Sequence, residues 1–400
     1  MINVKDADRI ITQNLPNYSA SQKSIFESHG CVLREDIVAD RDLPSFNKAL
    51  MDGIAIQMSS WEKGCRQFAI HGVQAAGERE KRVKSENGCV EIMTGAVVPS
   101  PCDAVIPIEQ VRVEGKLAIV HQSARLDKFQ YIRRQGEDYK KGTVLLKAGC
   151  VLNSPKMALA VSVGKTKVKA TSILKVAAVS TGDELVAAHA RGIKSYQIRQ
   201  SNGHFIKLNL ERSGLFSVSV FHIKDNEKIL KQKLNQILKT FDVLVLSGGV
   251  SMGKFDFVPK VLSALGVRTL FHKVAQRPGQ PLFFGQTKAG QPVFGLPGNP
   301  VSTQVGTVRY VARHLRRALG APSVDEFATL TAATPGSTNL TIFQPVMIKC
   351  QTDAQLTATP VRTGGSGDFA SAAKTDGFVE IPAGQNSVQA GFVAKLFRWE

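Results

Sequence analysis

The segment VLVLSGGVSMGKFDF, residues 243–257, joins an apolar run to residue types that bind oxyanions. Its candidate binding positions are Ser247, Gly248, Gly249, Ser251 and Gly253. Glycines permit positive φ angles and a close approach of successive backbone N–H groups to an anion, and serine hydroxyls add donors. Asp256 follows, and a carboxylate suits this position when a cation bridges it to the anion. The segment therefore predicts a phosphate site with Mg²⁺.

Two further glycine-rich turns follow predicted strands, STGDEL at 180–185 and FGLPGNPVS at 294–302. In open α/β sheets, ligands bind at the edge where the carboxyl ends of the strands meet. One such turn alone is typical of a structural turn. Three turns at one edge, two of them with acids, favour a ligand site instead.

A basic segment without clear periodicity, FHKVAQRPGQPLFFG at 271–285, adds Lys273 and Arg277 beside prolines that stiffen the chain. A stiff basic loop next to anion-binding turns is suited to oxyanion recognition. The alternative interpretation is a solvated basic hairpin.

The elements that must position these turns alternate between strand and helix from residue 173 to residue 320. Apolar runs predict strands at 173–180, 215–223 and 241–247. Helical patterns separate them, and the order βαβαβ predicts a doubly wound, mostly parallel α/β sheet.

Two helices are expected between these strands. The first, at 201–214, has a serine cap, an apolar face through Phe205 and Leu208, and a closing glycine. The second, at 225–240, begins at Asp225 as its N-cap. Its apolar residues recur at i, i+4 and i+7, namely Leu230, Leu234 and Ile237.

The flanking regions have a different character. Short apolar runs alternate with Gly and Pro turns at 88–120, which predicts β structure. The N-terminal region has a helical pattern with Ile25 and Phe26 on its apolar stripe and Gly30 as its stop. The tail from about residue 322 is rich in Thr, Gly and Ala, which predicts a small β-barrel or sandwich.

The composition limits the class of protein. A chain of 400 residues is longer than one core usually needs, so we expect several domains. No apolar stretch of about 18 residues predicts a membrane span, and the N-terminal residues lack the apolar core of a signal peptide. The six cysteines are scattered without paired spacing, which indicates reduced thiols and no structural zinc site. We expect a cytoplasmic protein.

The net charge of +18 raises nucleic acid as a possible partner. The basic residues lie in short separate groups, however, and no basic stretch is interleaved with aromatic residues for base stacking. A basic surface also attracts small anionic substrates. We therefore expect no nucleic-acid or membrane partner.

Six motifs, over nearly the whole length, resemble the molybdopterin molybdenumtransferase family, to which MoeA and the gephyrin E domain belong. They occur in the order and at about the spacing of the family, and together they are specific although each alone is weak. The motifs are DLPSFNKALMDGIAI (42–56), EIMTGAVVPSPCDAVIPIEQ (91–110), RRQGEDYKKGTVLLKAG (133–149), VSTGDEL (179–185), SGGVSMGKFDFV (247–258) and FGLPGNPVS (294–302).

The resemblance implies a multidomain α/β plus β architecture. The expected parts are a linker domain at 1–45 and 141–172, a β-rich domain at 46–140, an α/β molybdopterin-binding domain at 173–321 and a C-terminal β domain at 322–400. It also implies a homodimer whose active site lies between the α/β domain of one subunit and the β-rich domain of the other.

The implied reaction takes adenylylated molybdopterin and molybdate, releases AMP and inserts molybdenum into the dithiolene with the help of Mg²⁺. Breaking a phosphoanhydride requires neutralisation of charge on phosphoryl oxygens, which a divalent cation, basic side chains and backbone N–H groups supply. The adenylylating enzyme of the same pathway is an expected partner.

The resemblance also carries residue roles. The implied catalytic residues are Asp52, Thr94, Asp138 and Glu184, and the implied metal ligands are Asp225 and Asp256. The implied substrate-binding residues outside the SGGVSMG turn are Lys273, Arg277, Pro297, Gly298, Pro300 and Ser366, the last of which matches a serine associated with molybdate. Each acid has a structural alternative as a helix cap or surface charge, and Asp225 in particular has the position of an N-cap.

The chain departs from the family pattern at positions that the resemblance relates to anion binding. Ile54 replaces a tyrosine, Gln200 an aspartate and Gln280 a lysine, and Gln344 stands where an arginine is usual. A catalytically weakened paralogue that binds or scaffolds molybdopterin is therefore the alternative function. The adenylylating family is disfavoured, since its phosphate loop carries TGGTG and its chains lack the additional β domains.

Overall fold

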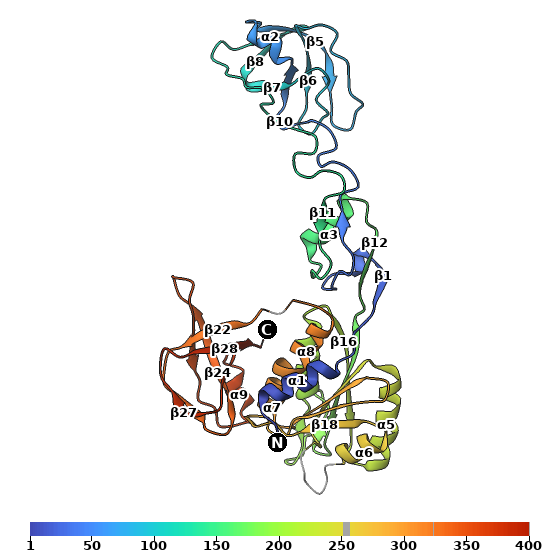
Figure 1. Cartoon of the computed structure of the whole chain (residues 1–400), viewed down its shortest axis with the longest axis vertical. Helices are drawn as coiled ribbons and strands as arrows, with labels where there is room; N and C mark the ends of the chain where they lie inside the picture. Colours follow the sequence, from blue (N-terminus) through green and yellow to red (C-terminus); the bar gives the residue numbers. More distant parts are fainter. Residues whose placement is uncertain (251–256, 323, 400) are drawn as a thin grey trace. The chain divides into compact units, whose positions relative to one another are not determined.

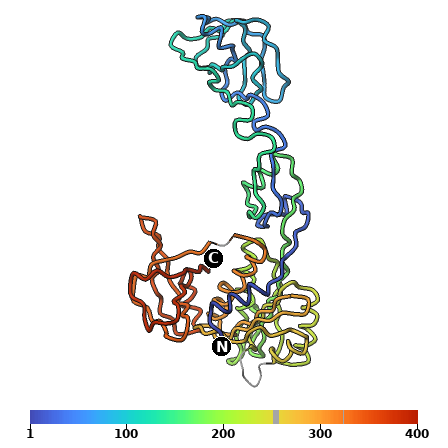
Figure 2. Tube along the Cα trace, in the orientation of Figure 1, coloured from blue at the N-terminus to red at the C-terminus, as the bar shows by residue number. Residues whose placement is uncertain are grey.

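The computed structural model describes residues 1–250, 257–322 and 324–399. Contacts divide the chain into a first unit, residues 1–35, 148–157 and 167–400, and a second unit, residues 36–147 and 158–166. The chain leaves the first unit and returns to it twice. Figure 2 traces the chain from its N-terminus in blue to its C-terminus in red. The multidomain α/β plus β architecture is confirmed, whereas the four expected domain boundaries stay predictions.

The first unit contains a six-stranded sheet in the order β16-β13-β17-β21-β20-β18 (Figure 1). Its parallel strands are β13 (Leu174–Thr181), β16 (Phe216–Ile223), β17 (Val243–Ser247) and β21 (Pro292–Leu296). The strands β18 (Arg268–His272) and β20 (Phe283–Gln286) complete the sheet in antiparallel pairings. The predicted strands at 173–180, 215–223 and 241–247 are confirmed within a residue or two at each end.

Alternate residues of the central strands enter two separate cores, which is the sign of a doubly wound sheet. Val176 and Val245 pack in one cluster, and their neighbours Ala177 and Leu244 pack in the other. The helices on the first face are α1 (Val4–Asn14), α4 (Asn202–Glu211), α7 (Pro300–Gly306), the π-helix η3 (Thr307–Ala312) and α8 (Arg313–Ala318). Those on the second face are α5 (Glu227–Thr240) and α6 (Val258–Ala264).

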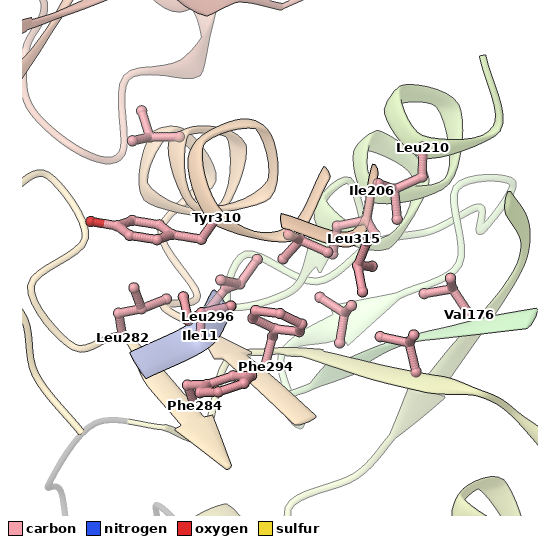
Figure 3. Packing of buried hydrophobic residues seen from close by; sticks show 14 of the residues in the cluster. Ile11, Val176, Ile206, Leu210, Leu282, Phe284, Phe294, Leu296, Tyr310 and Leu315 are labelled. Atoms are coloured by element: carbon pink, nitrogen blue, oxygen red, sulfur yellow. The ribbon is translucent and has the colours of Figure 1, made fainter. Parts of the chain in front are cut away.

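Figure 3 shows the first of these cores. Ile206, Leu210 and Leu315 point from helices toward Phe284 and Phe294 of the sheet. All five side chains are almost completely buried. This packing fixes the strand ends that carry the predicted turns.

Three helix predictions need correction. The N-terminal helix ends at Asn14, and Ile25 and Phe26 lie instead in a short 3-10 turn, η1 (Ile25–Glu27). Leu208 is 71% exposed, because α4 buries Gly203, Ile206 and Leu210 rather than the expected face. Asn226, not Asp225, caps α5, and its side chain accepts a hydrogen bond from the Ile229 N–H at 3.0 Å.

The C-terminal part of the first unit is a closed five-stranded barrel, so the β-barrel prediction is confirmed. Its strands follow the order β24-β25-β22-β28-β26, and the pairing of β24 with β26 closes the ring. They are β22 (Glu326–Leu330), β24 (Thr341–Cys350), β25 (Leu356–Pro360), β26 (Gly377–Ile381) and β28 (Val393–Arg398). A short strand of the basic loop, β19 (Gln276–Arg277), pairs with β24 and ties the loop to the barrel.

Smaller elements complete the first unit. They are β1 (Ala20–Ser24), β12 (Lys167–Thr171), β14 (Leu185–Val186), β15 (Ile198–Arg199), β23 (Thr334–Ser337), β27 (Gln385–Val388) and α9 (Phe369–Ala372). The helix α3 (Ser154–Ser162) spans residues of both units.

The second unit is built on a six-stranded sheet in the order β7-β4-β6-β5-β9-β8, which confirms β structure at 88–120. Its strands are β4 (Gly53–Ile56), β5 (Gln67–Gln74), β6 (Gly88–Ile92), β7 (Ala104–Pro107), β8 (Val111–Glu114) and β9 (Leu117–Val120). The remaining elements are β2 (Ile37–Val38), β3 (Lys48–Ala49), β10 (Ile132–Arg133), β11 (Val144–Leu146), α2 (Met58–Glu62) and η2 (Ile108–Gln110).

The helices in the described ranges include none with the length and apolar character needed to span a bilayer. All six cysteines are free thiols, as their scattered spacing predicts.

Candidate functional site

A cleft of about 930 Å³ lies at the carboxyl ends of β13, β17 and β21. All three predicted turns contribute to its lining, through residues at 180–185, 247–250 and 297–302. The basic loop adds residues 276–281, and the barrel part of the first unit adds residues from 335 to 366. The expectation that these turns share one sheet edge is therefore confirmed.

The Ser247-Gly248-Gly249 turn is shaped by its glycines. Gly248 and Gly249 have φ angles of 92° and 64°. A Cβ at Gly248 would stand 2.7 Å from the carbonyl oxygen of Thr181, and one at Gly249 would stand 2.8 Å from the Thr181 hydroxyl. Both positions thus require glycine. The other predicted residues of this segment, Ser251, Gly253 and Asp256, lie outside the described residues.

The hydroxyl of Thr181 marks a position where a ligand or water is needed. The side chain is only 5% exposed, and its Oγ1 has no hydrogen-bond partner in the described part of the chain. A buried hydroxyl without a partner costs free energy. This hydroxyl lies beside Gly248 and Gly249, next to the turn that is predicted to bind an anion.

The LPGNP turn is held by amide side chains. Asn202 Nδ2 donates to the Gly298 carbonyl at 2.7 Å and to Ser247 Oγ at 2.8 Å, which joins two of the three turns. Asn299 Nδ2 donates to Ser366 Oγ at 2.8 Å, and the Val301 N–H donates to the Ser366 carbonyl at 3.1 Å. Ser366 is therefore fixed against the start of α7, beside Pro297, Gly298 and Pro300.

Two predicted acids line the cleft, Glu184 and Asp225. Since Asn226 caps α5, the structural alternative for Asp225 as an N-cap is wrong. The Asp225 N–H donates to Asp183 Oδ1 at 3.2 Å, which holds the two turns together. The Glu184 carboxylate lies over Gly182, where an added Cβ would come within 2.5 Å of Glu184 Oε2.

No group of three or more His, Cys, Asp or Glu that would bind a metal occurs within residues 1–250, 257–322 and 324–399. The cleft instead offers separate carboxylates from Glu184 and Asp225. Mg²⁺ is often held by one or two carboxylates, with water and substrate phosphate as its other ligands. Two separate carboxylates are thus a donor set that suits Mg²⁺, and they are too few for a metal site made entirely of protein ligands.

The basic loop contributes one of its two predicted cations to the lining. Arg277 lines the cleft, whereas Lys273 lies outside its lining at the end of β18, with its N–H donating to the Leu282 carbonyl at 3.0 Å. Gln276 anchors the loop, because its buried side chain donates to the Gly279 carbonyl at 2.9 Å and accepts from the Tyr310 hydroxyl.

Sequence reasoning missed one cation of the cleft, Arg199. Its Nε donates to the Ala188 carbonyl at 2.9 Å, and its Nη2 donates to that of Ala190 at 3.1 Å. No local signal marks it, since its strand, β15, is only two residues long and shows no periodicity. The pairing of β14 with β15 brings it beside the STGDEL turn.

The glutamines that depart from the family pattern also line the cleft, and their amides have partners within the protein. Gln200 Nε2 donates to Ser180 Oγ at 3.1 Å, and Gln344 Nε2 donates to the Val361 carbonyl at 2.8 Å. Gln280 Nε2 contacts Met1 Sδ at 3.1 Å. The fourth departure, Ile54, is fully buried in the sheet of the second unit.

The remaining predicted catalytic residues belong to the second unit, where all three are exposed. Thr94 donates from both its N–H and its hydroxyl to Asp52 Oδ1, each at 2.7 Å, and these bonds lower the pKa of Asp52. Asp138 forms an ion pair with Arg133, which raises the pKa of that guanidinium. That these residues join the cleft stays a prediction.

Three family models match successive parts of the chain. Residues 2–164 match the MoeA N-terminal region (domain I and II), residues 177–317 match a probable molybdopterin binding domain, and residues 328–396 match the MoeA C-terminal region (domain IV).

Curated relatives and solved structures match at full length. A molybdopterin molybdenumtransferase of Synechocystis is 34% identical over 100% of both chains, and one of Haemophilus influenzae is 31% identical over 91% of this chain and 90% of its own. The crystal structure of a molybdopterin biosynthesis MoeA protein from Pyrococcus horikoshii has a TM-score of 0.81 and 28% identity, covering 100% of this chain and 99% of that one.

Proposed function

Because the chain belongs to the molybdopterin molybdenumtransferase family, we propose that it inserts molybdenum from molybdate into adenylylated molybdopterin and releases AMP. It is a transferase of molybdenum cofactor biosynthesis. The observation that carries the proposed reaction is the convergence of the three glycine-rich turns, Arg277 and Ser366 in one cleft.

In this proposal, one part of the cleft binds the phosphate of the substrate and another part binds molybdate. Gly248, Gly249 and the Thr181 hydroxyl bind phosphate oxygens of the substrate, and Arg277 neutralises their charge. Ser366, fixed by Asn299, donates to molybdate. This assignment gives the unpartnered hydroxyl of Thr181 a ligand.

Glu184 and Asp225 would hold Mg²⁺, with Asp256 as the third acid that the family resemblance assigns. The ion, when bound, supplies positive charge that neutralises phosphoryl oxygens. Glu184 is kept in place by Gly182, and Asp225 by its hydrogen bond to Asp183.

The second unit would complete the site of a partner copy. We propose a homodimer in which Asp52, Thr94 and Asp138 of one subunit face the cleft of the other. Their exposure supports an intermolecular role, since the polar cluster is open to a substrate bound by another chain. A cytoplasmic location and the adenylylating enzyme as a partner belong to the same proposal.

The test is reconstitution from purified protein, adenylylated molybdopterin, molybdate and Mg²⁺, with AMP and active cofactor measured separately. Glu184→Gln should lower AMP release about 100-fold, because it removes a charge that would hold the ion. Glu227→Gln is the matched control, since Glu227 lies just beyond Asp225 but pairs with exposed Lys260.

If the wild-type protein binds the adenylate but forms neither AMP nor cofactor at any molybdate concentration, the transferase reaction is wrong. The protein would then be the molybdopterin-binding or scaffolding paralogue. If Glu227→Gln loses as much activity as Glu184→Gln, the assignment of Glu184 is wrong.

A further inference from the structure

A second cleft, of about 430 Å³, lies in the first unit and shares no lining residue with the candidate active cleft. The ends of α4 and α8 line one side, and β22 and β28 of the barrel line the other. Four arginines line this cleft, Arg212, Arg313, Arg316 and Arg398. Two acids, Asp325 and Glu326, line it as well, so cations outnumber acids in this cleft.

Only part of this charge is balanced by acids. Arg313 pairs with Asp325 at 3.0 Å, and Arg398 pairs with Glu326 at 2.8 Å. Neither Arg212 nor Arg316 has an acidic partner in the described residues. Burial and the nearby charge of Arg212 lower the pKa of Arg316, so the two guanidinium groups repel each other.

A buried donor adds a second observation. Arg313 Nε has no hydrogen-bond partner in the part of the chain that the structure describes, although its side chain is only 14% exposed. A buried donor of a charged group is costly to leave unsatisfied. An anion in the cleft would satisfy this donor and offset the repulsion.

Helix dipoles explain some of the arrangement but not all of it. Arg212 is the C-cap residue of α4, and Arg316 lies in the last turn of α8, where a cation is favourable. That effect supports one cation at each helix end. It does not explain why two helix ends bring their cations to one half-buried cleft.

A third cleft, of about 740 Å³, adjoins this one and shares Arg212 and Arg398 with it. Phe205 and Trp399 line it, with their rings in edge contact at 6.4 Å, together with Leu356. Aromatic and apolar surfaces next to a guanidinium pair suit a ligand with a planar ring and a phosphate group.

We propose that the two adjoining clefts form a second anion site, in which Arg212, Arg316 and Arg313 bind a phosphate group and the aromatic side holds the ring of a nucleotide. Guanidinium groups bind phosphate through paired N–H donors. Free phosphate would bind to the same guanidinium groups, and the experiments below distinguish it from a nucleotide.

The first experiment measures thermal unfolding with inorganic phosphate against chloride at equal ionic strength. The wild-type Tm should rise by at least about 3 °C when phosphate is in large excess over its Kd. The double variant Arg212→Gln/Arg316→Gln should fold without phosphate, because it loses a repulsion. Its rise in Tm should be clearly smaller than that of wild type, since only the proposed phosphate-binding residues of the active cleft remain.

The matched control is Arg79→Gln/Arg82→Gln, which removes two exposed charges from the second unit and should keep the rise. Arg316→Lys keeps the charge but not the paired donors and should show a smaller rise. An undiminished rise in the Arg212/Arg316 variant would overturn the proposal, and so would the absence of any rise in wild type.

The second experiment uses Trp399 as a reporter in a Trp61→Phe background, since these are the two tryptophans of the chain. Titration with AMP should change the fluorescence of Trp399 several-fold more than phosphate does, and only while Arg212 and Arg316 are present. If phosphate raises the Tm while AMP leaves Trp399 unchanged, the bound species is free phosphate and the nucleotide assignment is wrong.

Discussion

At the scale of single residues, Gly182 sets the position of an acid in the cleft. Its φ of 147° is rarely adopted by other residues, and a Cβ would collide with the Glu184 carboxylate. Gly182→Ala should therefore displace this carboxylate and lower kcat for AMP release by about 10- to 100-fold. The measurement is the steady-state rate as a function of Mg²⁺ concentration.

Gly192→Ala is the control for this prediction. Gly192 also has a positive φ, of 64°, but an added Cβ would meet nothing within 4 Å. Both variants place a Cβ at a positive φ, and only the first crowds the acid. Equal losses of activity in the two variants would contradict the role of Gly182 in positioning Glu184.

Thr94 controls the protonation of Asp52. Its hydroxyl and its N–H both donate to Asp52 and lower the pKa of this carboxyl group. A pKa lowered by folding means that the contact stabilises the protein above about pH 4 and is lost as the pH falls through the folded-state pKa. Thr94→Val removes one donor and should raise the pKa of Asp52, measured by NMR titration.

Thr143→Val serves as the comparison, because Thr143 is exposed and lies elsewhere in the second unit. It should leave the titration of Asp52 unchanged. A Thr94→Val protein with an unchanged pKa for Asp52 would show that the N–H alone controls the carboxylate.

Residue types and spacing identified most of the cleft, because turns after parallel strands converge whatever their exact conformation. The turn that carries Glu184 and the basic loop that carries Arg277 are predictable in this way, whereas Ser366 follows from family resemblance alone. The predicted cap of α5, Asp225, lies one residue before the observed cap, Asn226. Aspartate and asparagine are both favoured N-cap residues, so the residue type alone does not decide between them. Arg199 had no signal, because strand pairing rather than sequence spacing brings it to the cleft.

At the scale of elements, one buried arginine joins a helix, the π-helix and the barrel. Arg309 of η3 is 2% exposed and donates to both carboxylate oxygens of Asp8 in α1, at 2.7 and 2.8 Å, and to Glu380 of β26 at 2.8 Å. Arg309→Met would remove the guanidinium that Asp8 and Glu380 share and leave Asp8 with His314 Nε2, at 3.3 Å, as its remaining partner. It should reduce the free energy of unfolding by about 3–5 kcal/mol. Urea unfolding of the full-length chain measures this.

The control is Arg9→Met, which breaks the exposed ion pair of Arg9 with Asp6 in α1. Exposed pairs contribute little, so the expected change is below about 1 kcal/mol. Arg309→Lys should restore only part of the loss, because an ammonium group cannot reproduce the bidentate bond to Asp8. Full stability in Arg309→Met would disprove the proposed link between the elements.

The alternation of strand and helix was predictable because each element of the α/β sheet carries its own periodicity. The apolar face of α4 was not, because Phe205 and Leu208 are no less apolar than the buried Ile206 and Leu210, and only the position of the sheet decides which are covered. Local sequence patterns also do not predict that the barrel closes, because closure depends on the pairing of β24 with β26, which is distant in the sequence, as well as with β25.

At the scale of the whole molecule, the predicted catalytic residues divide between two units. Composition and periodicity give no reason to join Asp52 to Glu184, and only family resemblance does so. The two groups of residues are therefore best tested by function. If they act in one site formed by two subunits, the defects must complement each other between chains.

Mixing Asp52→Ala with Glu184→Gln subunits supplies this test. Each homodimer should be inactive, whereas half of a randomly assorted population is heterodimeric and carries one intact site in each dimer. About a quarter of the wild-type AMP release should therefore return after co-expression, with the dimer verified by sedimentation. A site built within one chain cannot regain activity in this way, because every subunit still carries a defect. Recovered activity in mixed dimers thus distinguishes a site shared between two subunits from a site built within one chain.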